Sequence, residues 1–310
     1  MLANLFTNLF KINQRGKVNM ALEPLKIKRV GTYEDYIVHF DESQQANKQI
    51  ASYEKGLVPD SRTQFTFNGY CYVCKAHVDF LVDFNYSYEV DGKLTPNWRE
   101  RLECPRCRLN NRMRAIIHML DLEYDDCSRR NPVVYITEQL TPLYKALQQR
   151  YPILYGSEYL GSSVACGAFN GQGVRNEDLT RLSFTDHYFD IILSFDVFEH
   201  VPDYSEALAE CFRCLKPGGV LIFTVPFDRA SARNIVRARY SADGTLEHLL
   251  PPEYHGDPIN SEGCLSFYTF GWELLQDLIS IGFVDAQALL YYSKFYGYLG
   301  GEQLILTASK

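Results

Sequence analysis

The sequence lacks any long apolar run. No stretch reaches the roughly 18 consecutive apolar residues of a membrane span, and the start, MLANLFTNLFK, has no basic segment followed by a continuous apolar core. We therefore expect no membrane span and no secretory signal.

Positive charge is also scarce, because 31 Lys and Arg against 38 Asp and Glu give a net charge of −7. This balance argues against nucleic acid as the main partner, and we expect a soluble, cytoplasmic protein.

Internal repeats and low-complexity tracts are absent too, so solenoid and disordered architectures are excluded. A chain of 310 residues with 46% hydrophobic content should hold about two globular units. Changes in composition predict an N-terminal extension (1–60), a small β module with a linking helix (61–126) and an α/β domain (127–310) with an insert at 227–268. Apolar residues of the extension suit one face of a short docked helix: Leu2, Leu5, Phe6, Leu9 and Phe10.

Four of the nine cysteines form two C-x2-C pairs. Cys71 and Cys74 make one pair, Cys104 and Cys107 make the other, and 29 residues lie between them. A tetrahedral divalent ion needs four such soft ligands, and each C-x2-C turn presents two thiolates. Because no further polar ligand is evident, the spacing predicts a closed, structural Zn²⁺ site in a zinc ribbon.

A cluster of basic residues accompanies the second cysteine pair. Two interpretations are open: an RNA-binding patch, or a set of side chains that brace the ribbon against the acidic α/β domain. Stacking aromatic residues are not interleaved in the cluster, which favours bracing. Its members are Arg99, Arg101, Arg106, Arg108, Arg112 and Arg114.

From residue 131 onward, apolar strand-like runs alternate with helical patterns, which is typical of an α/β domain with a mainly parallel sheet. Thr141 and Pro142 suit the start of one helix, and Gly282 suits the end of another. Cys211 and Cys214 lie on or beside the apolar stripe of a third helix, so we interpret them as core residues. The last two strand-like runs, FVDAQALLYY and EQLILTAS, predict an antiparallel hairpin at the sheet edge.

The stretch at 174–226 contains a D-L pair, an FD-hydrophobic strand, an EHV segment and LKPGG, in that order. It closely resembles the second half of class I S-adenosylmethionine-dependent methyltransferases of the type 11-like group. The resemblance covers about 131–310 and implies a doubly wound, Rossmann-like, seven-stranded sheet with a terminal antiparallel hairpin. Together with the four-cysteine module, the chain resembles bacterial zinc-ribbon methyltransferase-like proteins.

The resemblance implies a set of S-adenosylmethionine contacts. Asp178 would accept a hydrogen bond from the adenine amino group with Leu179 alongside the ring, and Glu158 would bind the ribose hydroxyls bidentately. The first strand departs from the family, because VVYITEQLTPLY has no glycine where a G-x-G-x-G turn is usual. We expect Glu138 to replace the usual acid, facing the cofactor's amino group, with side-chain hydrogen bonds from Gln139 and Thr141. The full expected set is Thr137, Glu138, Gln139, Glu158, Asp178, Leu179 and Asp196.

Candidate proton acceptors follow the fourth and fifth strands of the expected sheet. The insert, with HLLPPEYHGDP, is expected to roof the pocket, with His255 as the base, Tyr254 and Glu253 orienting the acceptor, and His200 as the fallback. The predicted function is O- or N-methylation of a small molecule, sugar or secondary metabolite. The alternative is a non-catalytic protein of this fold that binds RNA or a protein through its Arg-rich ribbon.

Overall fold

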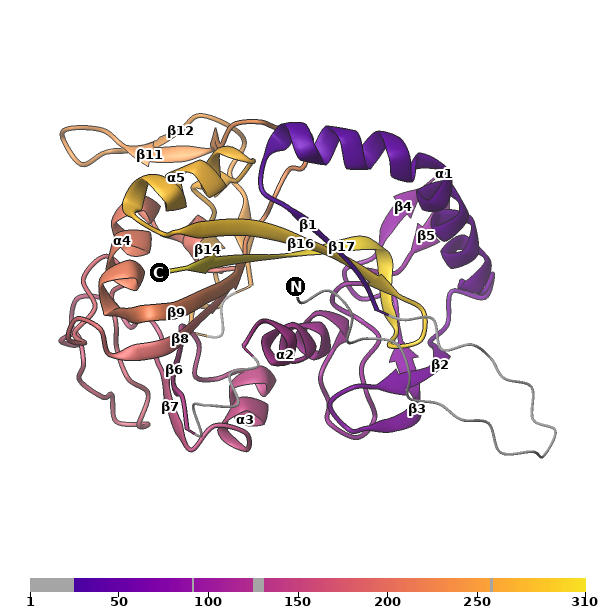
Figure 1. Cartoon of the computed structure of the whole chain (residues 1–310), viewed down its shortest axis with the longest axis horizontal. Helices are drawn as coiled ribbons and strands as arrows, with labels where there is room; N and C mark the ends of the chain where they lie inside the picture. Colours follow the sequence, from indigo (N-terminus) through magenta and orange to yellow (C-terminus); the bar gives the residue numbers. More distant parts are fainter. Residues whose placement is uncertain (1–24, 91, 125–130, 257–258) are drawn as a thin grey trace, which may run out of the picture.

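The computed structural model describes residues 25–90, 92–124, 131–256 and 259–310, so the helix expected within residues 1–10 lies outside the described residues. Its central feature is a seven-stranded mixed sheet in the order β1-β16-β17-β9-β8-β6-β7 (Figure 1). The strands β7, β6, β8 and β9 are parallel, and β17, β16 and β1 are antiparallel to their neighbours. Their bounds are Lys26–Val30 (β1), Val133–Ile136 (β6), Ile153–Gly156 (β7), Phe189–Phe195 (β8), Leu215–Thr224 (β9), Asp285–Ser293 (β16) and Tyr298–Ser309 (β17).

Two details of the sheet correct the expectation. The terminal hairpin β16–β17 is not at the edge, because β1 from the N-terminal extension pairs with β16. At the other end, the segment around Asn176 forms only an isolated parallel bridge with Glu158. Three of the five residues of β1 are exposed and basic side chains dominate it, and such charge discourages further strand pairing at a free edge. The sheet therefore has seven strands, but one of them comes from outside the α/β domain.

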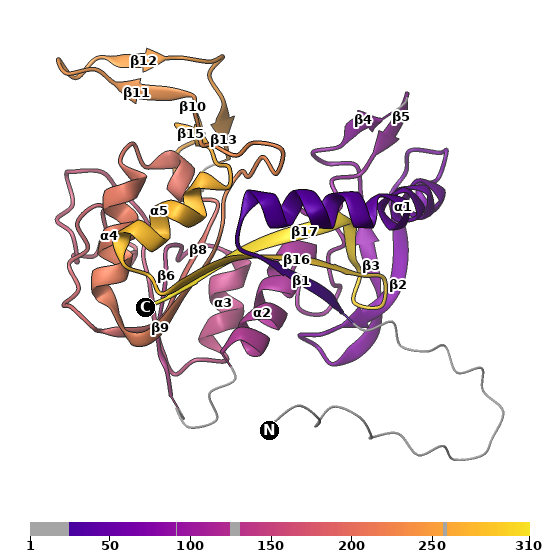
Figure 2. The same ribbon diagram turned by 45° about the horizontal axis from the view of Figure 1, so that its top comes forward.

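Helices cover both faces of the sheet. Figure 2 shows α2 (Asn111–Glu123) and α3 (Pro142–Gln148) on one side, and α4 (Tyr204–Cys214) and α5 (Glu273–Ile281) on the other. Side chains of the central strands alternate between the two layers: Val134 and Ile136 join one core, whereas Tyr135 joins the other. Cys211 and Cys214 are buried in the second core, which confirms their packing role.

The helix boundaries have the local causes that the sequence predicted. The Thr141 hydroxyl accepts a hydrogen bond from the Tyr144 amide at 3.2 Å, and Pro142 occupies the first turn of α3. Gly282 ends α5 with φ +127°, in the region that favours glycine. Within the described ranges, no helix has both the length and the apolar character to cross a membrane.

The four-cysteine module lies at the far end of the β16–β17 hairpin (Figure 1). It contains the hairpin of β2 (Phe65–Cys71) and β3 (Ala76–Val82), a short pair formed by β4 (Tyr88–Val90) and β5 (Lys93–Thr95), and the long helix α1 (Tyr33–Leu57) packs beside it. Its core includes Phe80 and Trp98 together with Tyr292 and Leu299 of the hairpin. Residues of β16 and β17 thus complete the core of the module, which is a separate cluster from the two cores of the α/β domain.

The segment after β9 forms three small antiparallel pairs. They are β10 (Ile235–Val236) with β15 (Tyr268–Thr269), β11 (Ala238–Tyr240) with β12 (Leu246–His248), and β13 (Tyr254–His255) with β14 (Cys264–Leu265). A short 3₁₀ helix, η1 (Phe198–His200), follows β8. The Phe267 amide donates to the Glu199 carbonyl at 2.7 Å, so the insert is attached directly to the turn that follows β8.

Candidate active site

The four cysteines of the two C-x2-C pairs come together in the module. The sulfur atoms of Cys71 and Cys107 are 3.8 Å apart, those of Cys74 and Cys104 are 3.7 Å apart, and all four lie within 4.8 Å of one another. None of them is in a disulfide. Zn–S bonds of about 2.3 Å in a tetrahedron place neighbouring sulfur atoms about 3.8 Å apart. The residues present therefore fit a Zn²⁺ ion.

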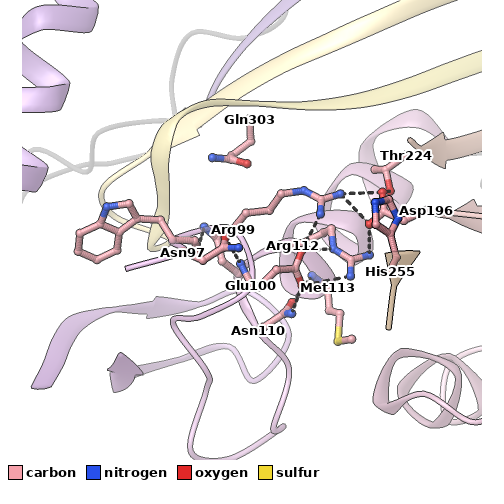
Figure 3. Close-up of polar contacts among 12 residues, drawn as sticks. Asn97, Arg99, Glu100, Asn110, Arg112, Met113, Asp196, Thr224, His255 and Gln303 are labelled. Atoms are coloured by element: carbon pink, nitrogen blue, oxygen red, sulfur yellow. Dashed lines mark hydrogen bonds and ion pairs between the residues drawn. The ribbon is translucent and has the colours of Figure 1, made fainter. Parts of the chain in front are cut away.

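Two arginines of the module reach the α/β domain at the end of β8. The Arg99 guanidinium donates to both carboxylate oxygens of Asp196 at 3.0 and 2.9 Å, and Arg112 lies 3.4 Å from the same carboxylate. Glu100 binds both arginines from the other side, at 2.6 and 2.8 Å. Figure 3 shows this chain of alternating charges, with the Thr224 hydroxyl donating to Asp196. These contacts match the bracing interpretation.

Asp196 is held in an unusual way. It follows β8 with φ +56°, and burial raises the pKa of its carboxyl, but Arg99, Arg112 and the Thr224 hydroxyl together hold that pKa well below its ordinary value. Asp196 is therefore an ionised carboxylate whose hydrogen bonds are committed within the protein. These contacts place Asp196 at the domain junction, and its predicted cofactor contact stays a prediction.

The other arginines of the cluster also make internal contacts. Arg101 pairs with Asp83 within the module, and Arg108 lies 2.8 Å from Glu103. Arg114 is fully buried and donates to the carbonyl oxygens of Tyr296, Gly297 and Leu102. Five of the six arginines thus stabilise the module or its junction with the sheet.

Glu158, after β7, organises the glycine-poor loop after β6. Its Oε1 accepts hydrogen bonds from the backbone amides of Gln139 at 2.8 Å and Leu140 at 3.0 Å. The Gln139 side chain fastens the same loop, because it donates to the Gly173 carbonyl and accepts from the Arg175 amide. Two hydrogen bonds satisfy Oε1 of Glu158, so that oxygen cannot also bind ribose without releasing the loop.

Thr137 and Gln139, which were both predicted to contact the cofactor, make hydrogen bonds within the protein. The Thr137 side chain is buried and donates to the Ser194 hydroxyl on the neighbouring strand at 3.1 Å. Both amide atoms of Gln139 bind backbone groups of the 173–175 segment. Thr137 therefore lies in the sheet interior and Gln139 anchors the loop, and their cofactor contacts stay predictions.

Glu138 follows Thr137 in the same loop. One of its carboxylate oxygens, Oε1, is buried and has no hydrogen-bond partner among the described residues. Burial raises the pKa of Glu138 to about 7; Arg112 and Thr141 lower it, whereas Glu158 and Asp196 raise it. An unsatisfied buried carboxylate oxygen is costly unless a ligand completes it. Glu138 is therefore the acid of the predicted set with unused binding capacity.

Asp178 and Leu179 lie on the segment that bridges to Glu158. The Asp178 Oδ1 accepts hydrogen bonds from the Thr180 amide at 3.0 Å and the Thr180 hydroxyl at 2.7 Å, and the Leu179 side chain is 8% exposed. The bridge between Asn176 and Glu158 brings the two predicted acids to the same edge of the sheet. This is the carboxyl edge, where ligands of open α/β sheets bind.

The structure brings His200 and His255 together, as the sequence predicted for the loops after β8 and β9. Their ring centroids are 5.0 Å apart in an edge-on arrangement. The Glu199 carboxylate, 3.5 Å from Nδ1 of His255, raises the pKa of His255 to about 9, burial opposes this increase, and the hydrogen bond to Glu253 adds to it. Glu253 also pairs with Arg237 at 2.8 Å. Tyr254, by contrast, is 57% exposed.

Glu199 is the functional candidate that the sequence reasoning missed. It precedes His200 in the EHV segment, its side chain is fully buried, and it lies within 3.6 Å of both His200 and His255. The signal was available, because a Glu-His pair directly after a buried strand places two ligand-type side chains at the carboxyl edge of the sheet.

A cavity lies elsewhere, between α1, β4–β5 and the end of the β16–β17 hairpin. Its volume is about 500 Å³, and Trp98, Arg229 and Glu302 are among its lining residues. None of the residues predicted to bind the cofactor lines it. This cavity is therefore separate from the acids at the carboxyl edge.

The segment that matches a known family contains two of the predicted acids at the carboxyl edge of the sheet. Residues 143–223 match the methyltransferase domain family. This segment includes Glu158, Asp178, Asp196 and Glu199, and it spans α3 through most of β9. The match supports the resemblance seen in the EHV and LKPGG motifs.

The chain is similar to two curated proteins over part of their length. It is 33% identical over 183 residues to malonyl-[acyl-carrier protein] O-methyltransferase 1 of Coxiella burnetii, covering 53% of this chain and 62% of that protein. It is 38% identical over 53 residues, 17% of this chain and 21% of the relative, to a Mycolicibacterium smegmatis protein named "probable S-adenosylmethionine-dependent methyltransferase". The chain thus spans less than two thirds of the length of either relative.

Among solved structures, an S-adenosylmethionine-dependent methyltransferase from Mesorhizobium loti aligns with 63% of this chain and 96% of its own. The sequence identity is 17% and the TM-score is 0.37.

Proposed function

We propose that the chain is an S-adenosylmethionine-dependent methyltransferase that methylates an oxygen or nitrogen of a small-molecule, sugar or secondary-metabolite acceptor. The observation that carries this proposal is the position of Glu138, Glu158 and Asp178 at one carboxyl edge, with Glu158 and Asp178 inside the matched methyltransferase domain. Glu138 adds a buried oxygen without a partner. A hydroxyl- and amine-bearing ligand would satisfy these acceptors.

In this proposal each acid has one task. Asp178 would hold the adenine amino group, Glu158 the ribose hydroxyls, and Glu138 the cationic amino group of the amino-acid part. Oε1 of Glu158 already holds the 139–140 loop, so a ribose contact through this oxygen would release the loop. The bidentate contact implied by the resemblance would therefore compete with closure of the loop.

When bound, S-adenosylmethionine supplies an electrophilic methyl group on a sulfonium centre. The chain's own contribution is mainly positional, because in-line displacement requires the acceptor atom and the methyl carbon to be aligned. Glu138, Glu158 and Asp178 fix the donor from three segments. In this proposal the insert after β9, which is attached to η1 through the Phe267 amide, would exclude water and orient the acceptor.

We also propose a structural Zn²⁺ on Cys71, Cys74, Cys104 and Cys107. The sulfur separations support it, and two of the thiols are fully buried. The ion would fix the loop that carries Arg106 and Arg108 and, through the following residues, the start of α2. The arginines at the domain junction would then depend on the metal for their orientation.

Calorimetric titration with S-adenosylmethionine tests the function. The chain should bind it, and Glu158→Ala should weaken binding by about tenfold to a hundredfold, because a charged hydrogen-bond acceptor contributes about 1.5 to 3 kcal/mol. Glu158→Gln separates the two tasks of this residue, because its amide oxygen can still accept from the 139–140 loop while the charge is gone. Glu89→Ala, an exposed site on β4, is the matched control.

Two outcomes would contradict the proposal. One is absence of S-adenosylmethionine binding by the folded wild-type protein. The other is equal affinity in wild type, Glu158→Ala and Glu89→Ala, which would show that the carboxyl edge after β7 is not the cofactor site.

A further inference from the structure

Glu199 is a buried carboxylate without hydrogen bonds. It lies on η1 directly after β8, it is 0% exposed, and neither of its carboxylate oxygens has a hydrogen-bond partner in the described chain. Burying a carboxylate in this state is expensive unless a cation lies next to it. Two imidazole rings are the groups that face it, and each approaches Oε1 at more than hydrogen-bond length.

The first ring, His200, is oriented by a backbone carbonyl on the side away from Glu199. Its Nδ1 lies 2.8 Å from the carbonyl oxygen of Leu265 on β14. A carbonyl oxygen only accepts hydrogen bonds, so Nδ1 carries the proton and Nε2 presents a lone pair. This Nε2 lies 3.6 Å from Oε1 of Glu199.

The second ring, His255 on β13, is oriented in the same manner. Its Nε2 lies 3.0 Å from Oε1 of Glu253, and the other oxygen of Glu253 binds Arg237 at 2.8 Å. The proton on Nε2 is thereby directed to the carboxylate, and Nδ1 lies 3.5 Å from Oε1 of Glu199. A histidine whose outer N–H is held by a carboxylate or a backbone carbonyl is the arrangement found for metal-binding histidines.

We propose that Glu199, His200 and His255 bind a divalent transition-metal ion of the manganese-to-zinc series. Their ligand atoms lie within 4.8 Å of one another. Metal–ligand bonds of about 2.0 to 2.1 Å in a tetrahedron separate neighbouring ligand atoms by about 3.3 Å, close to the 3.5 and 3.6 Å observed from Glu199 to the two rings. Two imidazoles and one carboxylate are ligands that this series accepts.

This site is separate from the four cysteines and different in character. Three protein ligands leave at least one coordination position for water or an oxygen of a ligand, as in metal sites that are not closed. The His200 and His255 side chains are 13% and 28% exposed, so an ion can enter. The proposal does not depend on the methyltransferase assignment, since metal binding is measured without cofactor or acceptor.

Mn²⁺ is the probe that separates the two metal sites, because it is a harder ion than the thiolates of the cysteine cluster accept. Protein purified with its zinc is dialysed against Mn²⁺, and free Mn²⁺ is measured by electron paramagnetic resonance. We expect one Mn²⁺ per chain in wild type and less than a tenth of that occupancy in His255→Ala and in Glu199→Gln. His248→Ala, an exposed histidine on β12 of the same insert, should bind like wild type.

A variant of Glu253, which positions His255 but is not itself a ligand, gives a test that does not depend on the folding of the ligand variants. Glu253→Gln keeps all three ligands but weakens the support of His255, and it should lower Mn²⁺ affinity by about tenfold to a hundredfold. The rival arrangement is an ion pair in which protonated His255 alone neutralises Glu199. If the folded wild type binds neither Mn²⁺ nor a second Zn²⁺ per chain, or if His255→Ala binds as wild type does, the metal site is wrong and the ion pair is the correct account.

Discussion

Replacing Glu138 by glutamine tests whether this buried acid is kept for a ligand. Burial raises the pKa of its carboxyl from 4.5 to about 7, and Glu158 and Asp196 add to the increase while Arg112 and Thr141 oppose it. The neutral form is therefore favoured in the folded protein, and ionisation costs stability as the pH rises from about 4.5 to about 7. That shift corresponds to about 2 to 4 kcal/mol at pH 8.

The same substitution should have opposite effects on stability and on binding. Glu138→Gln cannot ionise, so above pH 7 its free energy of unfolding should exceed that of wild type by about 2 to 4 kcal/mol, and the difference should vanish near pH 4.5. Its affinity for S-adenosylmethionine should fall about tenfold to a hundredfold at pH 7.5, because a charged acceptor for the cationic amino group is lost. Urea unfolding and calorimetry at matched pH measure the two effects.

The pH profile of the wild type adds a third measurement. An α-amino group with a pKa of about 8 stays charged between pH 5.5 and 7, whereas the ionised fraction of Glu138 rises by about an order of magnitude. Affinity for S-adenosylmethionine should rise by the same factor, and Glu138→Gln should remove that slope. If the variant binds as tightly as wild type with the same pH dependence, Glu138 does not face the cofactor. If it also fails to gain stability above pH 7, the inferred burial of the charge is wrong.

Two further substitutions test the module and its junction. Cys104→Ser should lower the zinc content by one ion per chain in elemental analysis, whereas Cys211→Ser in the core of α4 should not, and full zinc retention by Cys104→Ser would refute the assigned ligands. Asp196→Asn should lower the free energy of unfolding by about 1 to 3 kcal/mol at neutral pH, because Arg99 and Arg112 lose a charged acceptor. Since the pKa of Asp196 is depressed, this difference should disappear as the pH falls from about 4; an equal effect in the exposed control Asp41→Asn would refute it.

Most of the α/β layers could be predicted from the sequence because their causes are local. Helix caps at Thr141 and Gly282, and the alternation that divides Val134 from Tyr135 between two cores, depend on neighbouring residues only. The edge strand β1 could not be predicted, because its five residues, KIKRV, have little apolar character and pair with β16, about 260 positions away. Non-local pairing leaves no periodicity in such a short, charged segment.

In the candidate site, too, the positions of the residues could be predicted from the sequence, whereas their binding partners could not. Residue types at strand ends placed Glu138, Glu158, His200 and His255 at the carboxyl edge, because this edge of a parallel sheet is fixed once the strands are known. What each acid binds depends on partners far along the chain. Asp196 was expected to face the cofactor. In the structure its carboxylate accepts hydrogen bonds from Arg99, nearly a hundred residues earlier in the chain.

The missing glycines and the occupied carboxylate of Glu158 have a common explanation. In the usual turn, glycine lets backbone amides approach the cofactor closely. Here the amides of Gln139 and Leu140 point instead to Glu158, so the loop needs no glycine and is closed by the acid of the next strand. In the proposed function the ligand is then held by side chains, and Glu138, whose buried Oε1 has no partner among the described residues, is the residue that we propose for its amino group. The glycine-free loop and the proposed role of Glu138 thus follow from one arrangement, in which Glu158 accepts the loop's amides.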